Sequence, residues 1–367
     1  MLFSAIKPIK TYPTQIPNLT PKFSPRMTLQ TQLQHALDNK TKPQGSLGRL
    51  ESIALQMGLI QQSTRPSAQP AELLLFAADH GVYAEGVAPF PQAVTAQMVA
   101  NILQGGAASS VMARTQGIAL TVVDVGVLTE FDAGFGAYPN FVRAKVAAGS
   151  ANLAREPALS AAQLRQAMQV GADAVARSTA KVLLVGEMGI ANTTPASAIC
   201  AALLNLPAAA VTGPGTGLDA QGVSHKARVI EAALVLHPSR DALEVLRCVG
   251  GLEIAAMTGA YLAAAKSGNA GKVLLIDGFI ATAALLVATR LSPAVLRHCI
   301  FSHCSGEPGH TVVLDALGAQ PLLNLGLRLG EGTGALAAYP LLVQACALLA
   351  EMASFESAGI SAKDAEA

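Results

Sequence analysis

The chain has 367 residues, enough for one large domain and a smaller one, and its 25 basic and 24 acidic side chains give a net charge of +1. Hydrophobic residues make up 51% and charged residues 13%, so we expect a large core, an oligomer interface, or both. The sequence has no basic stripe interleaved with aromatic residues, which gives no support to nucleic-acid binding. Five cysteines without a CxxC pair argue against a disulfide framework and indicate a reducing, cytoplasmic location.

The first 27 residues are rich in Pro, Thr and Lys and lack the apolar run of a signal peptide, so we expect an irregular arm. Helical spacing then predicts two short helices, over Thr28–Asn39 and Leu50–Gln62. A further helix follows the uncharged segment that starts at Gly332. We expect it to begin near Pro340, where proline suits a first turn, and to be buried in the protein rather than to span a membrane.

Short apolar runs alternate with helical patterns through the middle of the chain. The predicted strands are Glu72–Asp79, Ala119–Asp124, Lys181–Gly186, Pro207–Thr212, Lys272–Asp277 and Cys299–His303. The predicted helices are Ala93–Gln104, Ser160–Arg177, Val223–Leu236, Gly251–Lys266 and Ala281–Leu291. Continuous apolar strands separated by helices indicate an α/β fold, a parallel sheet covered by helices on both faces. We expect residues 66–335 to form this large domain, and residues 28–65 and 336–367 to form a small helical domain.

Polar, glycine-rich loops follow the predicted strands. They are Asp79–Gly81, Asp124–Gly126, Gly186–Thr194, Thr212–Asp219, Asp277–Gly278 and Ser302–His310. Ligands of open parallel sheets bind outside the carboxyl ends of the strands. Six such loops predict a single binding site along one edge of the sheet.

Two of these loops have the composition of an anion site. Gly186–Thr194 leads from a strand into a helix, whose N-terminal N–H groups suit a phosphate. Its Asn and Thr side chains can equally cap that helix. Gly213–Gly217 resembles a phosphate-binding nest but matches no P-loop or dinucleotide motif. Lys226 can add a charge to a phosphate, or it is an ordinary solvated lysine.

The segment Arg328–Gly334 places Glu331 between two glycines, which let a ligand approach the backbone. This glutamate is either held for chemistry or exposed on a turn. His303, Cys304, Glu307 and His310 cluster in the sequence, but their spacing fits no standard zinc site, and we expect no metal.

Taken together, these loops resemble the family of nicotinate-nucleotide–dimethylbenzimidazole phosphoribosyltransferases, enzymes of cobalamin lower-ligand assembly. The matching segments are Lys42–Glu51, Ala77–Val82, Pro91–Met98, Gly186–Thr194, Gly213–Asp219, Glu253–Met257, Asp277–Phe279, Ser302–His310, Arg328–Gly334 and Glu351–Met352. The resemblance covers about residue 40 to residue 360 and leaves residues 1–27 unmatched. It implies a homodimer whose large domain is a Rossmann-like six-stranded parallel sheet, with a small domain of N- and C-terminal helices.

The resemblance also implies a reaction. The phosphoribosyl group of nicotinate mononucleotide would pass to 5,6-dimethylbenzimidazole, giving α-ribazole 5′-phosphate and nicotinate without a cofactor or metal. Glu331 would be the catalytic base. The residues implied to bind phosphate or ribose are Glu187, Gly189, Ile190, Asn192, Thr193, Thr194, Gly215, Thr216, Gly217, Lys226 and Asp277. Those implied to bind the base are Pro89, Gln92, Met188 and Leu329.

Two alternatives stay open from the sequence. One is another nucleotide-dependent enzyme built on the same sheet, and the other is a protein that binds a nucleotide or an azole without transferring anything. The identity of the accepted base also stays open, because the segment from His80 to Gln92 contains no motif strict enough to choose between a benzimidazole and adenine.

Overall fold

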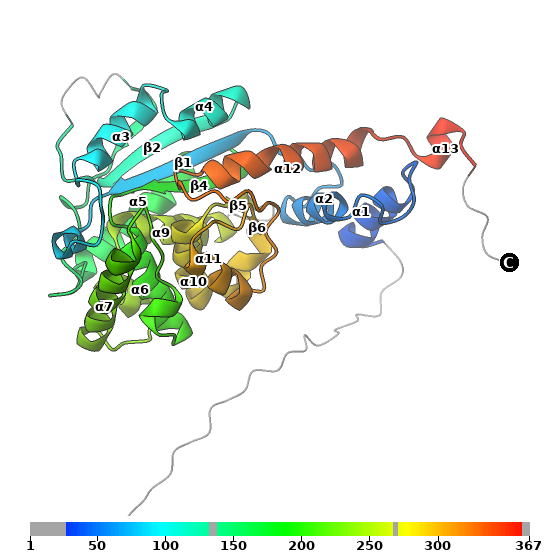
Figure 1. Ribbon diagram of the computed structural model, residues 1–367. Helices are drawn as coiled ribbons and strands as arrows, with labels where there is room; N and C mark the ends of the chain where they lie inside the picture. Colours follow the sequence, from blue (N-terminus) through cyan, green and yellow to red (C-terminus); the bar gives the residue numbers. More distant parts are fainter. Residues whose placement is uncertain (1–26, 132–137, 267–270, 362–367) are drawn as a thin grey trace, which may run out of the picture.

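The computed structural model describes residues 27–131, 138–266 and 271–361, and Figure 1 shows helices covering both faces of one sheet. The sheet has six parallel strands in the order β3-β2-β1-β4-β5-β6, which is the doubly wound order. The strands are β1 (Ala71–Ala78), β2 (Ala119–Gly126), β3 (Phe141–Arg143), β4 (Val182–Met188), β5 (Val273–Ile276) and β6 (Cys299–Phe301). The predicted fold class is confirmed, and the predicted arm lies outside the described residues except for Met27.

One predicted strand is wrong. The segment Pro207–Thr212 forms a short 3-10 turn, η3 (Ala208–Ala210), because a run of alanines lacks the branched side chains that favour strands. The sixth strand is instead β3, a three-residue edge strand that pairs with β2. Its residues are partly exposed and form no apolar run, so the sequence pattern did not reveal it.

The helices divide between the two faces of the sheet. Phe76 and Val185 point to one face, which is covered by α5 (Ala161–Arg177), α6 (Thr193–Leu204), α8 (Ala242–Val249), α9 (Leu252–Lys266) and α10 (Phe279–Leu291). Leu73 and Leu75 point to the other face, covered by α2 (Arg49–Ile60), α3 (Val94–Leu103), α4 (Ala108–Thr115) and α12 (Thr333–Glu351). The remaining elements are α1 (Leu29–Asp38), η1 (Gly81–Glu85), α7 (Ala220–Leu236), η4 (Pro293–His298), α11 (Pro308–Ala316) and α13 (Phe355–Ala358).

A capping box forms at the start of α5. Ser160 Oγ accepts the N–H of Gln163 at 3.2 Å, and the Gln163 side chain accepts the N–H of Ser160 at 2.8 Å. The helix α12, by contrast, begins at Thr333 rather than near Pro340. Proline removes the N–H that would bond the carbonyl four residues earlier. Gln116 Nε2 donates to that carbonyl, on Leu336, at 3.0 Å, so the helix continues through Pro340.

Helices α1, α2 and α12 lie together and extend past the sheet in Figure 1. Leu33, Met57 and Leu342 form a core between them that continues onto Leu73 and Leu184 of the sheet. Of the described helices, α12 is long and apolar enough to cross a membrane by length and composition alone, and 56% of that window is buried within the protein. The N- and C-terminal helices therefore pack together as expected, while the domain boundaries at 65 and 335 stay predictions.

Candidate active site

The loop Arg328–Gly334 lies directly across the end of β4. A side chain on Gly186 would come within 2.6 Å of the Gly332 nitrogen, so glycine at this position is what lets the loop approach the strand. Glu331 itself has φ of +57°, a conformation that residues other than glycine rarely adopt. Such strain is kept where the surroundings hold a residue for a purpose. The carboxylate is 3% exposed, which excludes the alternative of a solvated turn.

Asp277, at the end of β5, fastens this loop. Its carboxylate oxygens accept the N–H groups of Gly332 and Ala335, at 3.1 and 2.9 Å, and so cap the N-terminus of α12. Its Oδ1 also lies 3.8 Å from His303 Nε2. Burial raises the pKa of Asp277, and the neighbouring His303 acts in the opposite direction. Asp277 does not line the pocket described below, so the structure gives it a supporting position rather than the expected contact with ribose or base.

A pocket opens beside the loop at the carboxyl ends of the central strands. Of the residues predicted from the sequence, it is lined by Glu187, Met188, Gly189, Ile190, Asn192, Thr193, Gly215, Thr216 and Leu329. It is also lined by Gly278, Phe279, Ile280, His303, Ser305, Glu307, Arg328 and Gly330. The structure therefore brings together the loops after β4, β5 and β6, the loop Gly213–Gly217 and the segment Arg328–Gly330, which is followed directly by Glu331.

The start of α6 forms one wall of the pocket. Asn192 is the N-cap residue, yet its side chain makes no capping bond and instead donates to Glu187 Oε2. The Thr194 N–H bonds the Ala191 carbonyl at 3.0 Å and Pro195 has no N–H, so of the first three residues of the helix Thr193 offers its N–H to an anion. Lys226 Nζ donates to Thr193 Oγ1 at 2.8 Å and to the Gly213 carbonyl at 3.1 Å, which ties the two glycine-rich loops together.

Lys226 is fully buried, so the alternative of an ordinary solvated lysine is wrong. Burial lowers its pKa to about 8, and the carboxylate of Glu307 acts in the opposite direction. Lys226 lies behind the pocket lining, close to Gly215. A substituent on Gly215 would come within 3.3 Å of Nζ, so glycine at this position lets the loop pack directly over the ammonium group.

Two buried carboxylates line the pocket: Glu187, which accepts a hydrogen bond from the Asn192 side chain, and Glu307. Glu187 is surrounded by other acids, and burial together with Asp277 raises its pKa to about 8. Glu307 is 5% exposed, and neither of its carboxylate oxygens completes a hydrogen bond within the described part of the chain. Burial raises the pKa of Glu307, opposed chiefly by Lys226. A buried acceptor without a donor is costly, so Glu307 suits a ligand that supplies donors.

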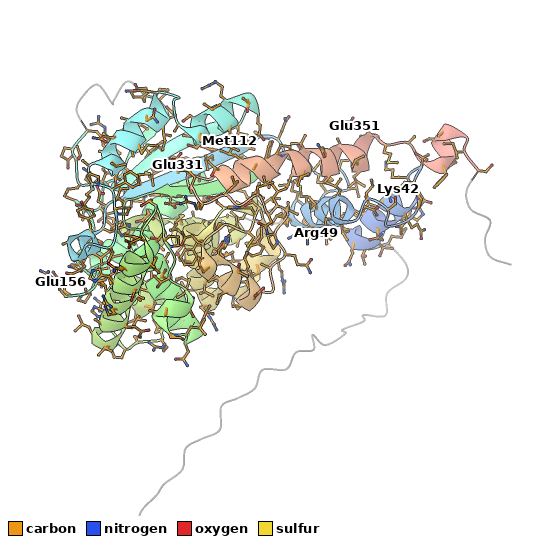
Figure 2. All side chains as sticks on the ribbon, in the orientation of Figure 1. Lys42, Arg49, Met112, Glu156, Glu331 and Glu351 are labelled. Carbon is orange, nitrogen blue, oxygen red and sulfur yellow. The ribbon has the colours of Figure 1, made fainter. Side chains whose placement is uncertain are left out.

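Glu331 is held by a residue that the sequence analysis missed. Ser109 Oγ, on α4, donates to Glu331 Oε2 at 2.9 Å, and the Ser109 side chain is fully buried. Figure 2 shows Glu331 at the start of α12, close to α4, which carries Met112. Burial raises the pKa of Glu331, and hydrogen bonds from the side chain and backbone of Ser109 act in the opposite direction. The contact joins residues 222 apart, so no local sequence signal could have revealed it.

The remaining predicted residues lie outside the pocket lining. Thr194 is fully buried within α6, and Gly217 lies beyond the lining residues of its loop. Pro89 does not line the pocket either, and Gln92 Nε2 donates to the His80 carbonyl at 3.2 Å. Pro89 and Gln92 therefore do not reach the pocket in this structure, so their expected contact with a base is not formed.

The loops after β1 and β2 have structural partners rather than pocket contacts. His80 Nε2 lies 2.9 Å from Glu253 Oε1, and both side chains are fully buried. Asp79 accepts the N–H of Leu128 at 2.8 Å, and Asp124 accepts that of Val127 at 2.8 Å. The expectation that all six loops form one site is therefore wrong for these two.

Within residues 27–131, 138–266 and 271–361, no three His, Cys, Asp or Glu side chains are grouped to hold a metal.

The chain is similar to known proteins of one enzyme class. A family model described as "Phosphoribosyltransferase" matches residues 24–360, so the chain is a member of a phosphoribosyltransferase family and a transferase. Among its relatives are two proteins named nicotinate-nucleotide–dimethylbenzimidazole phosphoribosyltransferase. The one from Cupriavidus necator is 51% identical, over 95% of this chain and 99% of its own. The one from Pseudomonas aeruginosa is 50% identical, over 89% of this chain and 93% of its own.

A solved structure agrees with these relatives. The crystal structure of CobT from Thermus thermophilus superposes with a TM-score of 0.86 at 42% identity, covering 91% of this chain and 99% of that one. The chain therefore belongs to the nicotinate-nucleotide–dimethylbenzimidazole phosphoribosyltransferase family, as the resemblance of its loops indicated.

Proposed function

We propose that this enzyme transfers the phosphoribosyl group of nicotinate mononucleotide to 5,6-dimethylbenzimidazole, forming α-ribazole 5′-phosphate and releasing nicotinate. The observation that carries the proposal is the buried, strained Glu331 beside a pocket whose walls suit a nucleotide. Family membership supplies the substrates, which are those in the names of the relatives. The product places the reaction in the assembly of the lower ligand of cobalamin.

The nucleotide would occupy the end of the pocket formed by Glu187, Gly189–Thr194, Gly213–Gly217, Lys226 and Glu307, here called the nucleotide end. Its 5′-phosphate suits the Thr193 N–H at the start of α6 and the ammonium group of Lys226. The ribose hydroxyls are donors, and Glu307 offers buried acceptor oxygens in the same pocket as Glu187. These contacts would fix the anomeric carbon in one orientation before reaction.

The azole would occupy the opposite end, formed by Met188 and Leu329 next to Glu331 and here called the base end. Met188 and Leu329 give it apolar surface, and Pro89 and Gln92 would have to move toward the azole to contact it. A neutral benzimidazole carries one N–H, which Glu331 would accept as the opposite nitrogen attacks the anomeric carbon. The bond to the pyridine nitrogen breaks, and its electron pair neutralises the cationic ring as nicotinate leaves.

The test mixes the protein with nicotinate mononucleotide and 5,6-dimethylbenzimidazole and measures free nicotinate. We expect nicotinate to form when both substrates are present, in equal amount to α-ribazole 5′-phosphate. Release without the azole would indicate hydrolysis of the nucleotide instead. Tight binding of either compound without release would leave a binding protein, and both outcomes contradict the proposal.

The proposal extends to assembly and location. We infer a homodimer, a cytoplasmic enzyme, and a small helical domain made of the segments 28–65 and 336–367. The shared core of α1, α2 and α12 supports that grouping of the terminal helices. Sedimentation velocity at micromolar concentration tests the dimer, which a species of 37.5 kDa at all concentrations would contradict.

A further inference from the structure

Helix α4 begins without a cap of its own. Its N-cap residue is Ala107, which has no side-chain acceptor, so the first N–H groups of the helix depend on some other part of the chain. Ser109, in this first turn, donates its hydroxyl to Glu331 Oε2 at 2.9 Å. The backbone N–H of Ser109 also faces the same carboxylate. The carboxylate of Glu331 therefore occupies the place of the missing cap.

The contact is specific to one of two adjacent serines. Ser110 is also buried, but its hydroxyl donates to the carbonyl of Ile102 at 2.7 Å, back along the chain. Only Ser109 of this pair is directed to the loop that carries Glu331. The hydroxyl of Ser109 donates to Oε2 of this carboxylate.

We propose that Ser109 is a positioning residue for Glu331. With the first turn of α4, it holds Oε2 in place, so that Oε1 faces the N–H of the bound azole. The inference rests on the proposed role of Glu331 as the base. The N-terminus of α4, on the opposite side of the loop, thereby sets the reactivity of this base together with burial.

The other groups around Glu331 make this contact necessary. From β4 the carboxylate of Glu187 faces the same region, and from the end of β5 Asp277 does so with His303 at 3.8 Å. Both acids, and burial itself, favour protonation of Glu331, which would remove its function as a base. From α4, the hydroxyl and N–H of Ser109 and the positive end of the helix favour the ionised form.

The test compares Ser109→Ala with Ser110→Ala, which removes the same atoms one residue further along the helix. kcat is measured against pH at saturating concentrations of both substrates, because it then reports ionisation in the bound complex. In Ser109→Ala we expect the acidic limb to move up by about half to one pH unit, which lowers kcat by about three- to tenfold below that limb. At high pH, kcat should return to within a few-fold of the wild type.

Ser110→Ala should keep the wild-type limb, and so should Ser109→Thr, which retains a hydroxyl at the same position. The KM for nicotinate mononucleotide should change little in Ser109→Ala, because Ser109 does not line the nucleotide end. An unmoved limb in Ser109→Ala, or an equal shift in Ser110→Ala, would overturn the inference. Glu331→Gln, measured in parallel, keeps the two ideas apart, since full turnover there would refute the base assignment itself.

Discussion

The two ends of the pocket are built in different ways. The nucleotide end consists of two glycine-rich loops, the start of α6 and one lysine, which lie within 40 residues of sequence from Glu187 to Lys226, together with Glu307. The base end depends on Glu331, which is held by Ser109 from α4 and by a loop fastened to Asp277. The first end recognises charge through local structure, whereas the second fixes one proton acceptor through contacts between distant segments. Binding and chemistry should therefore respond separately to mutation.

The largest effect should come from Glu331→Gln. The amide keeps the size of the side chain but cannot accept the azole proton in the same way, so kcat should fall by about 10²- to 10⁴-fold. The KM for nicotinate mononucleotide should stay within a few-fold, because Glu331 does not line the nucleotide end. Steady-state release of nicotinate measures both values. Unchanged turnover would remove Glu331 from the mechanism and abolish the contrast between the two ends.

Lys226→Ala should have the opposite signature. Loss of a charge-assisted hydrogen bond to phosphate, about 1.5–3 kcal/mol, predicts a rise of about 10- to 150-fold in the Kd for nicotinate mononucleotide. The Kd for 5,6-dimethylbenzimidazole should change much less. Titration calorimetry with each compound provides the comparison, and Arg228→Ala removes an exposed charge from the same helix as a control. An equal or larger loss for the azole would place the phosphate elsewhere.

Glu307→Ala sharpens the account of the nucleotide end. If its unpaired oxygens accept ribose hydroxyls, kcat/KM for nicotinate mononucleotide should fall by about tenfold. The same substitution should cost little when the substrate is a 2′- or 3′-deoxy analogue that lacks the donor. Asp315→Asn, at an exposed position on α11, serves as the matched control. A tenfold loss that persists with both deoxy analogues would mean that Glu307 acts on something other than the hydroxyls.

The last effect, on stability alone, concerns Glu187. Its pKa is raised to about 8 from an ordinary value of 4.5, so the folded protein keeps a proton that the unfolded chain releases as pH rises through 4.5. The resulting stabilisation is fully present below pH 4.5 and is lost as pH rises to about 8. Glu187→Gln should flatten this decline by up to about 1.4 kcal/mol per pH unit.

Denaturant unfolding at several pH values measures that slope without reference to turnover. Glu156→Gln is the control, because Glu156 is an exposed glutamate, labelled at the surface in Figure 2. If the wild type and Glu187→Gln share the same slope between pH 4.5 and 8, Glu187 is ionised in the folded protein. The ribose would then meet a charged acceptor at the nucleotide end, rather than a neutral carboxyl group.

Most of the sheet and one end of the site were predictable because their signals are local. Apolar runs predicted five of the strands, and the glycine-rich loops Gly186–Thr194 and Gly213–Gly217 did lie together, tied by Lys226. Pro207–Thr212 failed because an apolar composition describes a buried turn as well as a buried strand. The edge strand β3 has too little buried surface to leave a pattern in the sequence.

The sequence by itself determined the alternation of strand and helix, the family, and the presence of a carboxylate between two glycines, because each depends on neighbours along the chain. Only the tertiary structure decided that Asp277 supports the loop, that Glu307 is buried beside Lys226, and that Ser109 holds Glu331. Hydrogen bonds such as the one between Ser109 and Glu331 require a direction and a distance between atoms of far-separated residues. Those quantities exist only once the helices have packed on the sheet.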